Sequence, residues 1–142
     1  MAAKFSLGQI TDLYKCEEKG SYFSFYYTQF TSLANAIELL NSRGLNADQI
    51  NGTVHLVLKK RGVHAWKIFD ALKLFIETTK KMKLTADAVY SALITLIGYS
   101  GPMVLAEPVA KFPVVVEIND KAGLNLDLDQ LLRLTAAFSA IG

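Results

Sequence analysis

The chain has 142 residues, a length that fits one domain able to bury a core without disulfide or metal crosslinks. The only cysteine, Cys16, cannot form an internal disulfide, and the first residues lack the apolar run of a secretory signal. The sequence therefore excludes a disulfide-rich secreted domain and predicts a protein that stays in the cytoplasm or is assembled into a particle. Hydrophobic residues make up 51% of the chain, more than a small soluble monomer needs, so we expect apolar surface buried against other chains.

The N-terminal region is rich in aromatic side chains. Residues 1–20 fit either an extended arm or a short helix, with the second interpretation preferred. Residues 21–28 are so dense in Tyr and Phe that they predict a strand. On that strand Tyr22 and Tyr26 would share one face, which we expect to be covered by the core or by an interface.

Residues 32–43 predict the first substantial helix. Leu33, Ile37 and Leu40 recur at spacings of three and four, as they do on one side of a helix. Gly44 follows as the residue that ends it.

The next stretch leaves its structure open. Asn46 to Gln49 resembles a capping box, after which Asn51-Gly52 reads as a turn. Residues 54–58 alternate like a strand, but they also fit a helical turn that Gly62 would end.

A pair of helices is predicted in the middle of the chain. Residues 64–82 carry an apolar stripe of helical period, and residues 86–97 follow with Thr85 as their N-cap. Trp66 and Leu74 fall outside the first stripe and are therefore candidates for an interface.

Residues 88–106 carry no charge, and this run of nineteen matches the length of a membrane span. The sequence Ser100-Gly101-Pro102 would break the helix before it crossed a bilayer. We therefore expect no span and keep a membrane-associated protein only as an alternative.

Residues 114–118 look like the clearest strand in the sequence. Pro113 introduces three consecutive valines, a composition typical of a strand buried on both faces. Residues 124–126 would pair back as the second strand of a hairpin.

Residues 128–141 predict the final helix, with Asp127 as its cap. Its last nine residues carry no side-chain charge, whereas a free terminal helix is usually solvated by charged groups. Phe138 and Ile141 are therefore candidate contacts with the rest of the domain or with a neighbouring chain.

Together these elements predict a single α+β domain over residues 1–142, dominated by the four helices. A small antiparallel sheet would be built from residues 21–28, 114–118 and either 124–126 or 54–58.

The titratable residues form no recognisable catalytic or metal motif. His55 and His64 are nine residues apart and lack the spacing and the neighbouring ligands of a zinc site. The sequence contains no nucleophile elbow, phosphate loop or dinucleotide fingerprint. We therefore predict no metal and no cofactor, and a small enzyme or ligand-binding protein is kept as an alternative.

Basic residues gather in the middle of the chain. Between Lys59 and Lys83 there are eight Lys or Arg residues and two acidic ones, whereas the flanking segments are acidic overall. The candidate surface for nucleic acid or an acidic partner consists of Lys59, Lys60, Arg61, Lys67 and Lys81. The simpler interpretation of the same residues is a solvated helix end.

The apolar excess, the uncharged C-terminal end and the separated charges favour one function over the others. We expect a self-associating structural or assembly subunit, such as a component of a viral or phage particle or of another multi-subunit complex. Its expected partner is a second copy of the chain or a larger complex, and a nucleic-acid-binding protein is the first alternative.

Overall fold

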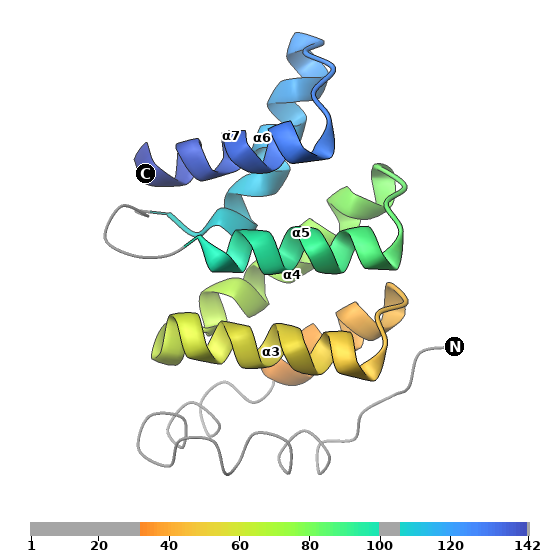
Figure 1. The fold of residues 1–142 in the computed structure, drawn as a ribbon, viewed down its shortest axis with the longest axis vertical. Coiled ribbons are helices and arrows are strands. Elements are labelled where there is room, and N and C mark those ends of the chain that lie inside the picture. Colours follow the sequence, from red (N-terminus) through yellow and green to blue (C-terminus); the bar gives the residue numbers. More distant parts are fainter. Residues whose placement is uncertain (1–31, 100–105, 142) are drawn as a thin grey trace.

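The fold of the described residues is entirely helical in this computed structural model, which describes residues 32–99 and 106–141 (Figure 1). The elements are a helix over residues 32–42, α3 (Ala47–Arg61), the short 3-10 helix η1 (Gly62–His64), α4 (Trp66–Lys81), α5 (Ala86–Gly98), α6 (Pro108–Ala122) and α7 (Leu128–Ile141). No strand occurs within these two ranges, so the predicted α+β class is wrong.

The helices form three hairpins that stack on one another in two layers (Figure 1). Residues 32–42 pair with α3, α4 with α5, and α6 with α7. The leading helices of the hairpins make the first layer, in which α4 packs on α6. The second layer contains α3, α5 and α7, with α5 in contact with both of the others. Stacked helical hairpins of this kind are the architecture of α-solenoids.

An internal repeat underlies the stack. Nine of the ten buried positions of the first hairpin have a buried equivalent 39 residues later in the second; the exception is Leu45, whose equivalent Leu84 is half-buried. The nine pairs are Leu33/Leu72, Ala36/Phe75, Ile37/Ile76, Leu40/Thr79, Ile50/Val89, Thr53/Ala92, Val54/Leu93, Val57/Leu96 and Leu58/Ile97. The leading helix of the third hairpin continues the pattern 40 residues on, where Phe112, Val115 and Val116 are buried. The leading helices of the three hairpins therefore bury equivalent positions of the repeat.

The turns of the hairpins repeat as well. Each leading helix is followed by a residue with positive φ: Gly44 at 93°, Lys83 at 60° and Gly123 at 63°. Glycine takes this conformation without the steric cost that Lys83 meets. The second helix then starts at a capping side chain, which is Asn46, Thr85 or Asp127. The third turn is longer, and it contains a second residue with positive φ, Asn125, before its cap.

Side chains also tie the first two hairpins together beside their turns. Arg43 donates from Nη2 to the carbonyl oxygen of Leu84. Gln49 donates from Nε2 to Oδ1 of Asp87 over 2.8 Å, so the starts of α3 and α5 are linked directly.

The predicted helices are confirmed, with small shifts at their ends. Residues 32–43, 64–82, 86–97 and 128–141 correspond to the helix over 32–42, α4, α5 and α7. The predicted caps at Thr85 and Asp127 are confirmed too.

The strand predicted at residues 114–118 lies inside α6 instead. Pro108 occupies the first turn of this helix, where the missing N–H costs nothing, and Pro113 is accommodated within it. Val115 and Val116 are buried, whereas Val114 is 45% exposed. A strand covered on both faces would bury all three valines, so their exposure follows the helical period.

The other strand predictions have different outcomes. Residues 54–58 belong to α3, which Gly62 ends, and the predicted turn at Asn51-Gly52 is interior to the same helix. Residues 124–126 lie in the turn between α6 and α7. The predictions for residues 1–20 and 21–28 lie outside the described residues.

None of the helices within residues 32–99 and 106–141 is both long and apolar enough to cross a bilayer, and residues 100–105 of the uncharged run lie outside the described residues.

Gly52 provides a test of the contact between the first two hairpins. A Cβ atom at this position would lie 3.0 Å from the hydroxyl oxygen of Tyr90 on α5. We expect Gly52→Leu to lower the free energy of unfolding by about 1–3 kcal/mol, because the side chain overfills the contact. Urea denaturation followed by circular dichroism measures the change.

The control is Gly98→Leu, also in a helix of the second layer, where a Cβ atom would meet nothing within 4 Å. An equal loss of stability in both variants would contradict the proposed clash with Tyr90.

Candidate interaction surfaces

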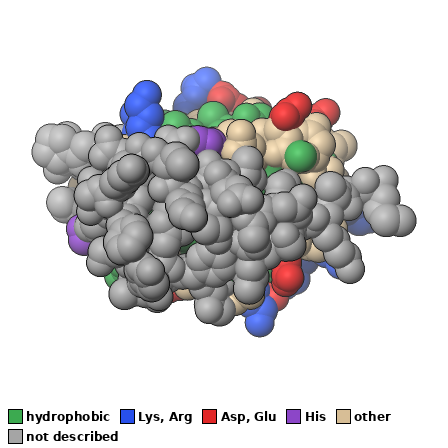
Figure 2. Space-filling model, turned by 90° about the horizontal axis from the view of Figure 1, so that it is seen from below, with side chains coloured by type: hydrophobic (Ala, Val, Ile, Leu, Met, Phe, Trp, Pro, Cys, Tyr) green, Lys and Arg blue, Asp and Glu red, His purple; other side chains and the backbone are tan. Residues whose placement is uncertain are grey.

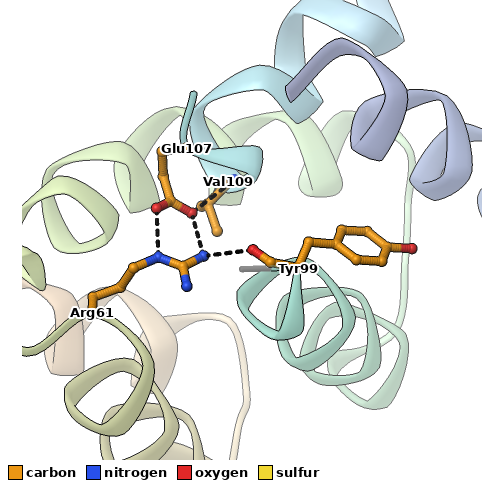
Figure 3. Close-up of polar contacts among 4 residues, drawn as sticks. All are labelled: Arg61, Tyr99, Glu107 and Val109. Carbon is orange, nitrogen blue, oxygen red and sulfur yellow. Dashed lines mark hydrogen bonds and ion pairs between the residues drawn. The ribbon is translucent and has the colours of Figure 1, made fainter. Parts of the chain in front are cut away.

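A buried ion pair joins the first and third hairpins at the edge of the stack opposite the turns (Figure 1 and Figure 3). Arg61, the last residue of α3, donates from Nε and Nη2 to the two carboxylate oxygens of Glu107, over 2.8 and 3.1 Å. Nη2 also donates to the carbonyl oxygen of Tyr99 over 3.2 Å. Glu107 in turn caps α6 through the N–H of Val109. One guanidinium therefore holds the ends of α3 and α5 and the beginning of α6.

Because this ion pair is buried, each charged side chain needs the other as its counter-charge. Each side chain is only 10% exposed, and Nη1 of Arg61 is buried without a hydrogen-bond partner among the described residues. A bidentate contact of this kind matches the planar fork of arginine, which lysine does not reproduce. Arg61 therefore has a structural role here and is less accessible than its lysine neighbours.

Glu107→Gln tests this junction. The amide keeps the size of the side chain but leaves the Arg61 guanidinium buried without a counter-charge. We expect the free energy of unfolding to fall by about 3 kcal/mol, the lower end for breaking a buried ion pair. Chemical denaturation measures the loss.

Glu117→Gln is the matched control, because it breaks the exposed i,i+4 pair with Lys121 in the same helix. Exposed pairs contribute little, so stability should hardly change. A small effect at Glu107 would show that the buried pair does not hold the junction.

Three of the predicted basic residues lie on the two sides of the junction between α3 and α4. Lys59 and Lys60 are exposed in the last turn of α3, and Lys67 is exposed in the first turn of α4. The ammonium nitrogen of Lys67 lies 5.9 Å from the ring centroid of Trp66, which is itself 38% exposed. We call Lys59, Lys60, Trp66 and Lys67 the basic corner.

Lys81 is not part of the basic corner. It is exposed at the opposite end of α4, about 21 Å from Lys67 along the helix axis. Figure 2 shows the molecule from the end of the stack formed by residues 32–42 and α3. Basic and acidic side chains both project at the edge of this view, and histidine side chains are visible at the surface. The five basic residues of the prediction therefore divide into a cluster of three lysines, the paired Arg61 and the distant Lys81.

The predicted interface residues also lie in different parts of the chain and differ in exposure. Trp66 and Leu74 are exposed on α4, Leu74 by 54%, in agreement with their position outside the buried stripe. Phe138 on α7 is half-buried and packs against the core. The side chains of Tyr22, Tyr26 and Ile141 lie outside the part of the chain whose side chains are described.

Two grooves run between successive helices of the first layer. One, of about 510 Å³, separates residues 32–42 from α4, and the other, of about 600 Å³, separates α4 from α6. Asn35 in the first groove and Leu74 in the second are equivalent positions of the repeat, as are Leu39 and Thr78. Sequence reasoning missed these grooves because it missed the repeat.

The described acidic and histidine residues do not form a metal-binding group, and Cys16 lies outside the described residues. Within residues 32–99 and 106–141, no three His, Cys, Asp or Glu side chains are grouped so that they could hold a metal ion. His64 is exposed and His55 is half-buried on α3.

No protein-family model, no curated protein and no solved structure matches this chain.

Proposed function

We propose that this chain is a structural subunit that self-associates through the exposed end of its third hairpin. This open end consists of Ile118 on α6 and Leu124 in the following turn, together with Val114, which also lines the groove between α4 and α6. The side chains of Val114, Ile118 and Leu124 are 45%, 37% and 49% exposed, and they account for three of the five large apolar side chains that are exposed among the described residues.

The alignment of equivalent positions in successive hairpins supports the proposal. Val114 and Ile118 are the equivalents, 40 residues on, of Leu74 and Thr78 on α4. Leu74 and Thr78 line the groove that α4 forms with the next helix of the first layer, α6. Val114 and Ile118 therefore occupy positions that, one hairpin earlier, border the groove beside a further helical hairpin, although Leu74 remains 54% exposed there.

Two charges beside the open end compensate each other within α6. Glu117 and Lys121 form an exposed ion pair with a distance of 2.8 Å between Oε1 and Nζ. The hydrogen bond from Lys121, together with its charge, lowers the pKa of Glu117 below its usual value. Association through this surface should therefore depend on apolar burial and tolerate salt, since salt screens charges and not apolar contacts.

A second copy of the chain is the occupant that fits these features. An apolar surface with balanced charge is complementary to itself, so two copies can meet about a two-fold axis with the same residues on both sides. The hydrophobic content of 51% supports the burial of further apolar surface.

Val114→Asp tests the proposal. Light scattering after size exclusion should give an oligomer for the unchanged chain at both low and high salt. The variant should be a monomer at the same concentration, because each copy would bury an uncompensated carboxylate at the contact.

Leu74→Asp is the matched control, since it places the same charge at the equivalent position of the preceding hairpin. It should leave the oligomer intact. A monomeric unchanged chain, or equal dissociation by both variants, would rule out assembly through the open end.

A further inference from the structure

We propose that the basic corner binds single-stranded nucleic acid, with Trp66 stacking on a base and Lys59, Lys60 and Lys67 contacting phosphates. The corner lies at the junction of the first two hairpins, whereas the open end belongs to the third. The two proposals therefore rest on different residues and can fail separately.

The segment that forms the corner contains no carboxylate, and the nearest one, Asp70, lies one turn along α4 from Lys67 and accepts a hydrogen bond from Ser32. No acidic residue occurs in the sequence between Asp48 and Asp70, and the first turn of α4 contains none. Glu107 is committed to the guanidinium of Arg61. The ammonium groups of Lys59, Lys60 and Lys67 form no ion pair with any described residue, so they are available to an anionic partner.

The basic corner also contains an exposed aromatic ring, that of Trp66. Trp66 is a large apolar side chain that remains 38% exposed, and Lys67 places its ammonium group over one face of the ring, which leaves the other face for a base. Proteins that bind single strands combine basic side chains along the backbone with aromatic rings on which bases stack. The corner contains both components within one helix junction.

A single strand fits this arrangement better than other polyanions. The bases of a duplex are stacked on each other and offer no free face to a surface ring, whereas those of a single strand do. An acidic peptide supplies negative charge but no flat aromatic face. Stacking of the Trp66 ring on a bound base therefore distinguishes a nucleic acid from a partner that binds through charge alone.

Trp66 is the only tryptophan of the chain, so its fluorescence reports on this position alone. The probe is a 12-nucleotide oligouridylate or oligothymidylate with a fluorescent label, titrated with the full chain. We expect the label anisotropy to rise and the tryptophan emission to be quenched at the same concentrations. The logarithm of the affinity should fall with the logarithm of salt concentration with a slope of about −2, from three phosphate contacts.

Trp66→Ala should weaken binding by about 5- to 150-fold, the range for loss of one stacked base. Trp66→Phe should retain most of the affinity because a ring remains. The helical circular dichroism of both variants identifies any loss of fold, and Trp66→Phe tests the site even if the alanine variant unfolds.

The lysines allow a closely matched comparison. Lys59→Gln/Lys60→Gln removes two adjacent exposed charges from the last turn of α3, and Lys80→Gln/Lys81→Gln does the same in the last turn of α4. We expect only the first pair to weaken binding and to reduce the salt slope.

Three outcomes would overturn the proposal. One is an equal loss of affinity in the two lysine pairs, which would indicate binding through overall charge. Another is binding without quenching of Trp66. The third is displacement of the oligonucleotide by polyaspartate or phosphatidylserine vesicles with the same change in Trp66 emission, which would assign the corner to acidic peptides or membranes.

Discussion

The stack depends on apolar stripes that no hairpin can cover alone. Phe75 on α4 and Phe112 on α6 show this directly, because their rings meet across the boundary between the second and third hairpins with centroids 5.3 Å apart. Both side chains are fully buried, and each would face water without the neighbouring hairpin. The Arg61–Glu107 pair adds a directional contact between the first and third hairpins, since apolar burial alone does not fix how hairpins are oriented.

The sequence predicted what is determined locally and failed where the outcome depends on distant residues. Helix ends were predictable because Thr85 and Asp127 cap their helices through bonds within one turn. The valines around Val115 were misassigned, because a short apolar run fits a buried strand as well as a buried helix. The repeat escaped notice because the matching turns, Gly44 to Asp48 and Lys83 to Asp87, share only Leu, Ala and Asp. Its clearer signal is the 39-residue recurrence of apolar positions.

The candidate surfaces, too, could be predicted from the sequence only where local residues determine them. The exposure of Trp66 and Leu74 could be predicted from the helical period, since both fall outside the buried stripe of α4. The burial of Arg61 could not, because its partner Glu107 is 46 residues away and nothing local distinguishes it from Lys60. The open end was equally hidden, since the exposure of Val114 has meaning only after it is aligned with Leu74 in the repeat.

The neighbour-to-neighbour packing of the hairpins also bears on how the chain folds as it is synthesised. Each hairpin closes through a short turn, and it packs on the hairpin that precedes it, about 40 residues earlier. Such contacts need only short loops to close, which favours rapid folding. A hairpin leaving the ribosome can dock on the one made before it, so the growing chain exposes one unpaired apolar surface at a time. Aggregation during translation is thereby limited to whichever end of the stack is currently uncovered.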